Sequence, residues 1–317
     1  MPIRVLFVTS RYPTKEAPGS SPCIEQQRRA LQKMGHEVDL LFIKSEQSRF
    51  NYIKEMWTVF WESQVKGKYD IVHAHYGYCG LVARMELRRP VVVTYRGSDV
   101  LSNSQRPISQ LVASLADCNI VMTEEMKQVL GRRDTHVIPY GIDLDIFYPR
   151  PIVDSRRELA LPLEAPLVLF PYDPKRREKR FDLVEQVCAL LRPSLPDLRV
   201  LAIHDKPPQV VATYMSACDA MVLASDHEGA PVAVREAMAC ELPIVSVDVG
   251  DVAELIGHTK GCHIVERSPE DIARKLAEVL RLRTRTLGRL AVVEMGTGVA
   301  AARISRLYEE LLQESRH

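Results

Sequence analysis

Residues 218–250 read CDAMVLASDHEGAPVAVREAMACELPIVSVDVG, and this stretch predicts a strand, a loop, a helix and a second strand. The segment from Met221 to Ala224 is a short apolar run, typical of a strand that is buried on both faces. Pro231 lies where the first residue of the helix is expected, because the N–H that proline lacks would have no partner there. Two buried strands joined by a helix are typical of a parallel α/β sheet.

The start of this helix is predicted to bind a phosphate. It follows the carboxyl end of a parallel strand, where unpaired backbone N–H groups and the positive end of the helix dipole point outward. Glu228 lies in the loop before the helix, and Glu236 lies inside the helix. A diphosphate held between the two carboxylates would leave each of them to accept hydrogen bonds from a hydroxyl-rich group, such as a ribose or a sugar. The stretch therefore indicates a nucleotide-sugar site.

The surroundings of the two glutamates resemble those in a known family. Glu228 and Glu236, with seven residues between them, resemble the E-x7-E motif of retaining GT-B glycosyltransferases, in particular glycosyltransferase family 4, or glycosyl transferases group 1. Chance alone would give on the order of one such pair in a chain of this length. The whole string HEGAPVAVREAMA, however, resembles that family's E-G-x-P-x-x-x-x-E-A-M-A. Two solvated glutamates on an ordinary helix are the alternative.

The resemblance covers nearly the whole chain and implies the α/β fold called GT-B. In that fold two Rossmann-like domains, each with a doubly wound parallel sheet, face each other across a cleft. We expect an N-terminal acceptor domain over residues 1–149 and a C-terminal nucleotide-sugar domain over 150–298. We expect a closing helix over 299–317 to pack back on the N-terminal domain. A chain of 317 residues is long enough for two domains.

Composition and charge are those of an ordinary soluble protein. The chain is 46% hydrophobic and 26% charged, and its formal net charge of +1 gives no general attraction to nucleic acid. It has no apolar run of about 18 residues, so we expect no membrane-spanning helix. The apolar run from Ile3 to Val8 is too short for a signal sequence, and we expect a cytoplasmic protein that is peripheral at most to the inner face of the membrane. The seven cysteines lack C-x-x-C spacing, which favours reduced thiols over zinc.

The resemblance assigns the donor contacts mainly to the second half. Glu228 would hold the sugar hydroxyls, and Glu236 would hold the ribose hydroxyls. Lys179 matches the lysine of the family's G-R-x-x-x-x-K-G-x-D segment, and Arg176, with Lys175 as the alternative, replaces its shifted arginine. Cations at this position would stabilise the charge that develops on a leaving nucleoside diphosphate. Glu228 and Lys179 are the expected catalytic residues, and the other expected donor contacts are Gly19, Gly229, Ala230, Pro231, Val232 and Ala233.

The expected acceptor contacts, His75, Arg96 and Asp99, lie in the first half. His75 ends the segment DIVHAH, which resembles the family's D-x-V-H-x-H, and a packing histidine is the alternative. The string TYRGSD resembles T-x-H-G-x-D, with Arg96 in place of the common histidine. An arginine stays protonated and cannot act as a base, but it can bind a phosphate or a carboxylate on an acceptor. We therefore expect an altered acceptor or sugar contact at this position.

An aromatic stripe lies on the helical stretch predicted over residues 45–66. It consists of Met56, Trp57, Phe60 and Trp61. We expect this stripe to belong to the core, and an exposed surface that faces an acceptor or a membrane is the alternative.

The resemblance implies transfer of a sugar from a nucleoside-diphosphate sugar, such as a UDP-sugar, to a hydroxyl with retention of configuration. The product would belong to envelope or extracellular polysaccharide, and the acceptor would be a sugar or a lipid-linked sugar. No metal and no cofactor beyond the nucleotide-sugar is expected, and no nucleic-acid partner. A nucleotide-sugar epimerase of the same fold and a non-catalytic nucleotide-sugar-binding or scaffold protein remain the alternatives. A phosphorylase would need a pyridoxal-binding lysine in its own motif, which the sequence lacks.

Overall fold

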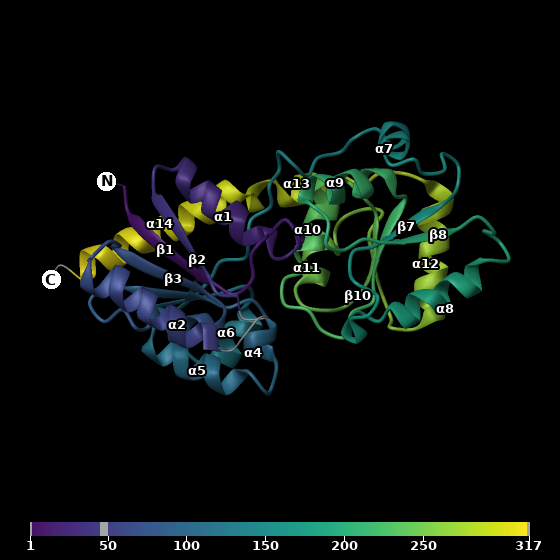
Figure 1. Cartoon of the computed structure of the whole chain (residues 1–317). Coiled ribbons are helices and arrows are strands. Elements are labelled where there is room, and N and C mark those ends of the chain that lie inside the picture. Colours follow the sequence, from purple (N-terminus) through teal and green to yellow (C-terminus); the bar gives the residue numbers. More distant parts are fainter. Residues whose placement is uncertain (1, 45–49, 316–317) are drawn as a thin grey trace. The chain divides into compact units, whose positions relative to one another are not determined.

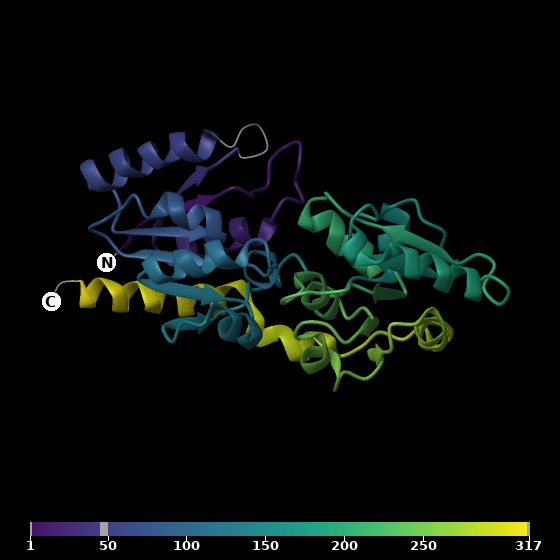
Figure 2. The same cartoon turned by 90° about the horizontal axis from the view of Figure 1, so that it is seen from below.

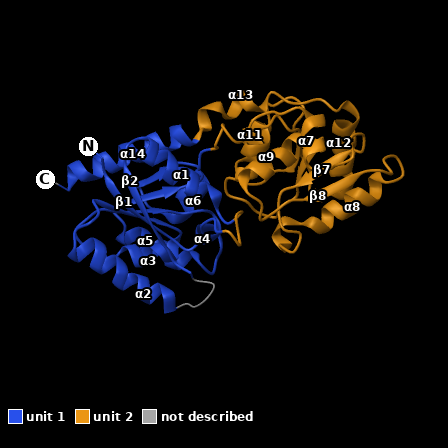
Figure 3. Cartoon of the chain, turned by 45° about the horizontal axis from the view of Figure 1, so that its top comes forward, with its two compact units in different colours: residues 1–14, 20–141, 297–317 blue, residues 15–19, 142–296 orange. Residues whose placement is uncertain are grey.

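The computed structural model describes residues 2–44 and 50–315 of the chain. These divide into two compact units (Figure 3). Unit 1 comprises residues 1–14, 20–141 and 297–317, and unit 2 comprises residues 15–19 and 142–296. The longer segment of unit 2 thus begins at residue 142, ahead of Pro149 and Pro151. Ile142 donates its N–H to the carbonyl oxygen of Met295 at 3.0 Å, which joins the beginning of this segment to its end.

Unit 1 is built on one parallel sheet with the strand order β2-β1-β3-β4-β5-β6 (Figure 1). Its strands are β1 Arg4–Thr9, β2 Glu37–Phe42, β3 Ile71–His75, β4 Val91–Thr94, β5 Cys118–Val121 and β6 Thr135–Val137. Its helices are α1 Pro22–Lys33, α2 Phe50–Val59, α3 Gly77–Ala83, α4 Ser98–Leu101, α5 Arg106–Leu115, α6 Glu124–Leu130 and α14 Thr297–Glu314, and the π-helix η1 Phe60–Val65 continues α2. Strands β1, β3, β4 and β5 are almost wholly buried and apolar, as expected for strands covered on both faces.

Helix α14 closes unit 1 and packs against α1 (Figures 1 and 2). Two histidines of the unit bond to it. His73 Nδ1 lies 2.5 Å from the Tyr308 hydroxyl, and His36 Nε2 lies 2.8 Å from the Ser305 hydroxyl. The sequence pattern also predicts one continuous helix over residues 291–313 at the end of the chain, and this prediction is wrong at its start. The chain there forms α13 Gly288–Val292 and a 3-10 turn, η3 Val293–Met295, before α14 begins. Gly296 is extended because it forms a β-bridge with Ile142.

Unit 2 is built on a second parallel sheet with the strand order β11-β10-β9-β7-β8. Its strands are β7 Leu167–Phe170, β8 Arg199–Ala202, β9 Ala220–Leu223, β10 Ile244–Val247 and β11 His263–Val265. Its helices are α7 Ile152–Glu158, α8 Phe181–Leu191, α9 Pro208–Ala217, α10 Val232–Ala239, α11 Val252–Ile256, α12 Pro269–Leu282 and α13, with the 3-10 turns η2 Arg177–Lys179 and η3. The strand, helix and strand predicted within residues 218–250 are confirmed as β9, α10 and β10.

The first strand of each sheet lies between the second and the third, so the chain runs in opposite directions across the sheet from that strand. In unit 2 this reversal separates β8 from β9 on the two sides of β7. Open α/β sheets bind their ligands outside the carboxyl ends of the strands at such a reversal. A ligand site of unit 2 is therefore expected at the loops after β7 and β9.

The aromatic stripe does not lie in the core, contrary to the prediction. The Trp57 and Trp61 side chains are exposed, and those of Met56 and Phe60 are only half-buried. Helix α2 packs against α3 through its other face, where Val59 is fully buried. Residues 45–49 of the predicted helical stretch lie outside the described residues.

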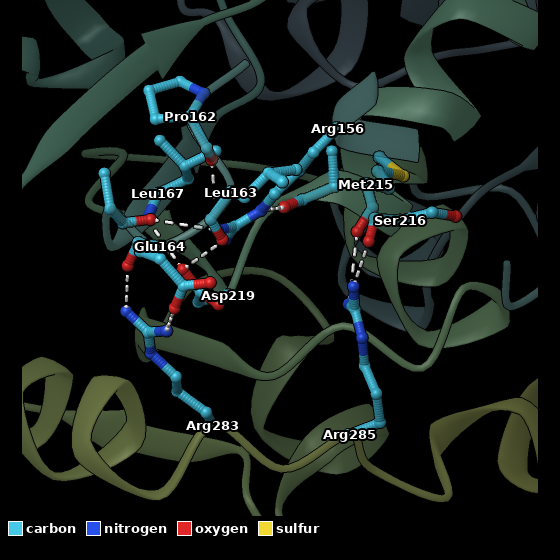
Figure 4. A network of polar contacts seen from close by, with 12 residues as sticks. Arg156, Pro162, Leu163, Glu164, Leu167, Met215, Ser216, Asp219, Arg283 and Arg285 are labelled. Atoms are coloured by element: carbon cyan, nitrogen blue, oxygen red, sulfur yellow. Dashed lines mark hydrogen bonds and ion pairs between the residues drawn. The ribbon is translucent and has the colours of Figure 1, made fainter. Parts of the chain in front are cut away.

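A buried ion pair stabilises the edge of the unit 2 sheet that lies opposite to the loops after β7 and β9 (Figure 4). Arg156 of α7 is 1% exposed and donates to an Asp219 carboxylate oxygen at 2.8 Å. The same oxygen accepts the Leu167 N–H at 2.7 Å, so the pair is tied to the first residue of β7. Arg156 also donates to backbone carbonyls, including that of Ala217 at 2.9 Å. The pair thus connects α7, β7 and the chain entering β9.

We predict that Arg156→Ala lowers the free energy of unfolding by about 3 to 5 kcal/mol, because it leaves the Asp219 carboxylate buried without its cation. Unfolding in urea followed by far-UV circular dichroism would measure this loss. Tryptophan fluorescence would not report on unit 2, because both tryptophans lie in unit 1. The matched control is Arg157→Ala: that side chain is 68% exposed, and its removal should change stability by less than about 0.5 kcal/mol. Equal effects of the two substitutions would contradict the assignment.

Candidate functional site

Lys179 and Glu228 meet at the reversal of strand order in unit 2. Lys179 ends the turn η2 after β7, and Glu228 lies in the loop after β9. The Lys179 ammonium lies 2.5 Å from a Glu228 carboxylate oxygen, although 49 positions separate the two residues in the sequence. The side chains are only 5% and 11% exposed. The structure therefore brings the two expected catalytic residues together at the place where this fold binds ligands.

Two further side chains hold this ion pair in place. The Ser225 hydroxyl donates to the same Glu228 oxygen at 2.8 Å. The Lys179 ammonium also lies 4.1 Å from the centroid of the Tyr172 ring, a cation–π contact. The sequence analysis missed both Ser225 and Tyr172. Only their positions in the sequence could have indicated a role, because each lies two residues after the end of a strand of the sheet.

The loops that carry the ion pair are also joined to each other. The Asp226 N–H donates to the Glu178 carbonyl at 2.9 Å. Arg180 forms ion pairs with Asp182 at 3.0 Å and with Asp226 at 3.1 Å. Because these contacts link the loop after β7 to the loop after β9, the position of Lys179 depends on both.

Burial is the main influence on the charged groups of the site. It lowers the pKa of Lys179, the nearby Glu228 carboxylate opposes this shift, and the positive charge of Arg176 adds to it. Burial also raises the pKa of Tyr172 well above its usual range, and the negative charge of Glu228 acts in the same direction. Arg176 itself is exposed and forms an ion pair with Glu178 at 2.7 Å, so it lies near the site without joining the Lys179 contact.

The start of α10 lies directly after Glu228. The helix begins at Val232, one residue later than expected, and Pro231 is its N-cap. The first helical amides, those of Val232 and Ala233, have no acceptor within the helix. Gly250, after β10, has a φ of +59°, and a Cβ there would lie 2.1 Å from the Gly229 carbonyl oxygen. A side chain at position 250 would therefore displace the loop that carries Glu228.

Glu236 lies on α10, one turn beyond these amides. Its side chain is half-buried, and burial raises its pKa to about 8. No hydrogen bond to the Glu236 carboxyl group is found among the described residues. A protonated carboxyl group has one O–H donor and part of its acceptor capacity, and hydroxyl groups that donate to it favour its ionised form.

Gly19 belongs to unit 2, while the residues that follow it belong to unit 1. A Cβ at Gly19 would lie 2.7 Å from the Cα of Asp205, so the loop after β1 approaches the loop after β8 as closely as backbone allows. Its expected contact with a donor phosphate stays a prediction.

In unit 1, Arg96 is a half-buried cation at the carboxyl edge of the sheet. It follows β4, and its guanidinium donates to the Ser21 hydroxyl at 2.6 Å and to Cys23 Sγ at 3.5 Å. Its guanidinium carbon also lies 5.5 Å from the centroid of the Tyr140 ring. Within residues 2–44 and 50–315, no carboxylate forms an ion pair with it. The arrangement therefore leaves a positive charge that an anionic ligand can neutralise.

Asp99 has a structural role in unit 1, and its expected contact with an acceptor stays a prediction. Its carboxylate is buried and accepts the backbone N–H groups of Arg96 at 2.9 Å, Gly97 at 3.0 Å and Gly77 at 3.2 Å. It thereby orders the loops after β3 and β4. All three contacts are with backbone, so they leave the Arg96 side chain available.

His75 is likewise buried, which favours the packing alternative over a direct acceptor contact. Its ring stacks on His73 with 4.5 Å between ring centroids, and its Nδ1 lies 3.1 Å from the Tyr140 hydroxyl. Burial lowers its pKa well below the usual range, so the ring is neutral. Its Nε2 has no hydrogen-bond partner among the described residues. Residues 2–44 and 50–315 also contain no group of three or more His, Cys, Asp or Glu that could hold a metal ion.

A cavity of about 640 Å³ in unit 2 lies apart from the ion pair. Its walls include Arg235, Asp251, His258 and Leu290, and neither Lys179 nor Glu228 lines it. We place the candidate site at the Lys179–Glu228 contact rather than in this larger space, because the contact combines buried charge with a helix start at the strand reversal.

Two family models match this chain. Residues 19–146 match the model described as Glycosyltransferase Family 4, and residues 198–290 match the model described as Glycosyl transferases group 1. The second match includes Glu228 and Glu236, and the first includes His75, Arg96 and Asp99.

Individual relatives are distant but extend over most of the chain. TuaC of Bacillus subtilis (strain 168), to which a glycosyltransferase step of teichuronic acid biosynthesis is provisionally assigned, is 23% identical over 86% of this chain and 88% of its own. The D-inositol 3-phosphate glycosyltransferase of Thermobispora bispora is 25% identical over 78% of this chain and 72% of its own. The crystal structure of HepE from Anabaena in complex with UDP and glucose superposes with a TM-score of 0.71 at 16% identity, covering 97% of this chain and 100% of that one. The predicted GT-B fold is confirmed.

The pKa of Glu236 gives a prediction on stability. A glutamate in an unfolded chain has a pKa of about 4.3, so the folded protein binds this proton more tightly than the unfolded chain. The stabilisation from Glu236 is therefore complete below about pH 4 and is lost as the pH rises toward 8. We expect Glu236→Gln to gain at least about 1 kcal/mol relative to the wild type between about pH 5 and pH 8.

Urea unfolding of both proteins at the two pH values measures this difference. Glu254→Gln, on the exposed surface of α11, is the control for the loss of one acidic group from unit 2. A constant difference between wild type and Glu236→Gln across the range would show that Glu236 ionises normally.

Proposed function

Because the chain belongs to the GT-B glycosyltransferases described by the family 4 and group 1 models, we propose that it transfers a hexose from a nucleoside-diphosphate sugar to a hydroxyl with retention of configuration. The observation that carries this proposal is the Lys179–Glu228 ion pair at the strand reversal of unit 2, directly before the start of α10. UDP is the proposed nucleotide, and support for it comes from HepE, whose structure holds UDP and glucose.

The diphosphate of the donor would lie at the start of α10. The amides of Val232 and Ala233 point there, and the Lys179 ammonium is held nearby by Glu228. A bound diphosphate would share this cation with Glu228, whose other oxygen can then accept sugar hydroxyls. Glu236 would accept the ribose hydroxyls, and those donors would favour its ionised form.

The transfer step needs positive charge more than it needs a base. As the bond between the anomeric carbon and the diphosphate oxygen breaks, negative charge develops on the leaving group, and Lys179 and the helix amides stabilise it. The leaving phosphate oxygen can take the proton of the acceptor hydroxyl as the new bond forms on the same face of the sugar. Lys179 supplies the charge that a metal ion would otherwise supply, so we propose that transfer proceeds without one.

The acceptor, we propose, carries a phosphate or a carboxylate. Arg96 supports this choice, because its guanidinium is half-buried, is held by Ser21 and forms no ion pair with a carboxylate of the described residues. The relatives are consistent with an anionic acceptor, since one is named for D-inositol 3-phosphate and the other for teichuronic acid. Synthesis of an envelope or extracellular polysaccharide is the proposed setting.

We predict that Lys179→Ala weakens the binding of UDP at least tenfold, about 1.4 kcal/mol, because the diphosphate loses its buried cation. Titration calorimetry with EDTA present would measure this loss. Arg177→Ala is the control, since Arg177 belongs to the same turn and is exposed. Unchanged affinity in Lys179→Ala would remove the diphosphate assignment.

The same variants separate an enzyme from a non-catalytic binder. The wild type should slowly hydrolyse one member of a UDP-sugar panel without acceptor, and both Lys179→Ala and Glu228→Ala should abolish that turnover. Binding without turnover for every donor and acceptor tested would favour the scaffold alternative. An epimerase would instead interconvert two UDP-sugars with no loss of UDP.

Arg96→Gln should discriminate between acceptors. We expect it to lower kcat/KM at least about tenfold for a phosphorylated acceptor, because one charge-assisted contact is lost. The effect on the unphosphorylated counterpart should stay within about threefold. Inositol 3-phosphate and inositol are a suitable first pair to compare. Equal losses on both acceptors would show that Arg96 only supports the loop.

A further inference from the structure

An exposed apolar surface on unit 1 has no role in the proposed chemistry. It consists of Ile53 and Trp57 of α2, Trp61 and Val65 of η1, and Leu87, and we name it the aromatic face. Each of these five side chains is between 51% and 67% exposed. Leu87 lies beside η1 because its N–H donates to the Gln64 side-chain oxygen at 2.9 Å. Large apolar side chains gathered in this way mark a surface that binds a partner or a membrane.

The helix geometry keeps these side chains in one line. They recur at steps of four residues after Ile53, a spacing that drifts slowly around an α-helix. The π-helical turn η1 is wider than an α-helical turn, so it corrects this drift and leaves Trp61 and Val65 in line with Trp57. π-helical turns occur frequently at functional sites.

The opposite face of the same helix is anchored to the unit. Val59 and Ser63 are buried, and Tyr52 lies 6.4 Å from Tyr78 of α3 between ring centroids. Helix α2 lies on the outer side of α3, with no described helix of unit 1 over it (Figure 2). The aromatic face therefore cannot turn inward without breaking the packing of α2 on α3.

The exposed and unpaired charges around the aromatic face are positive. Lys54, Arg88 and Arg89 are exposed, and none forms an ion pair with a described residue. Two acidic neighbours are already neutralised: Glu62 pairs with Lys66 at 2.6 Å, and Asp39 pairs with Lys68 at 2.8 Å. Glu55, which is half-buried, and Glu86, which is buried and accepts the backbone N–H groups of Arg88 and Arg89, form no ion pair with a described residue. The surface thus combines exposed tryptophan with unpaired cations.

We propose that the aromatic face docks the protein on an anionic lipid bilayer, with Trp57 and Trp61 at the level of the lipid headgroups. Tryptophan favours this interface, and an amphipathic helix with basic flanks lies in its plane. Lys54, Arg88 and Arg89 would contact the anionic headgroups. A second copy of the chain fits less well, because self-association through this face would bring the same cations together.

The docking surface does not depend on the proposed transferase activity. No described helix combines the length and apolarity needed to cross a membrane, so the contact would be peripheral. Trp57 and Trp61 are the two tryptophans of the chain, and the intrinsic tryptophan fluorescence therefore reports on this face alone.

The test adds vesicles to the full-length protein and measures tryptophan emission and co-sedimentation. We expect a blue shift and sedimentation with vesicles that contain about one third phosphatidylglycerol, and weaker binding to phosphatidylcholine alone. Trp57→Ser with Trp61→Ser should reduce partitioning at least about tenfold, while Trp57→Phe with Trp61→Phe should retain most of it. Leu111→Ser is the control, since it removes an exposed apolar side chain of unit 1 on α5.

Two outcomes would overturn the proposal. One is the absence of both signals with every vesicle composition while circular dichroism shows a folded protein. The other is a blue shift that grows with protein concentration without vesicles, together with a doubled mass by light scattering, which would identify a second copy as the partner. Arg88→Ser with Arg89→Ser should weaken binding to anionic vesicles only, and equal weakening on both vesicle types would remove the electrostatic part.

Discussion

The ion pair between Lys179 and Glu228 is the contact on which the candidate site depends. Both side chains are nearly shut off from water, and a buried charge without a partner is strongly destabilising. The loops after β7 and β9 must therefore keep their positions together, and the Asp226–Glu178 backbone bond and the Arg180 ion pairs help them do so. In the proposed function, a cation held in this way would stabilise a diphosphate at the start of α10.

The two units have the same kind of parallel sheet, but the charged side chains at the carboxyl ends of their strands are paired differently. In unit 2 the lysine at the strand reversal is matched by a carboxylate, so the site is close to neutral until an anion enters. In unit 1 the carboxylate of Asp99 is occupied by three backbone amides and forms no ion pair with the Arg96 guanidinium. That difference is the physical basis for assigning a diphosphate to one unit and an anionic acceptor to the other.

Much of the fold could be predicted, because buried parallel strands and their helices leave local signals. The strand, helix and strand predicted within residues 218–250 are β9, α10 and β10 of the structure. The helix expected from residue 291 could not be bounded, since the break at Gly296 comes from a bridge to Ile142. The aromatic stripe was misplaced for a related reason. Periodicity shows that a helix has apolar side chains, but α3 decides which face of α2 it covers.

The sequence by itself determined the element order, the GT-B class and the acidic residues around the start of α10, because these follow from short-range spacing and a family string. The tertiary structure decided which charges are paired and which are left over. Lys179 forms an ion pair with Glu228, the Asp99 carboxylate accepts backbone amides, and the His75 side chain is buried. These contacts form between side chains that parallel strands bring together from distant segments of the chain. The spacing of residues in the sequence does not predict which of these side chains will be in contact.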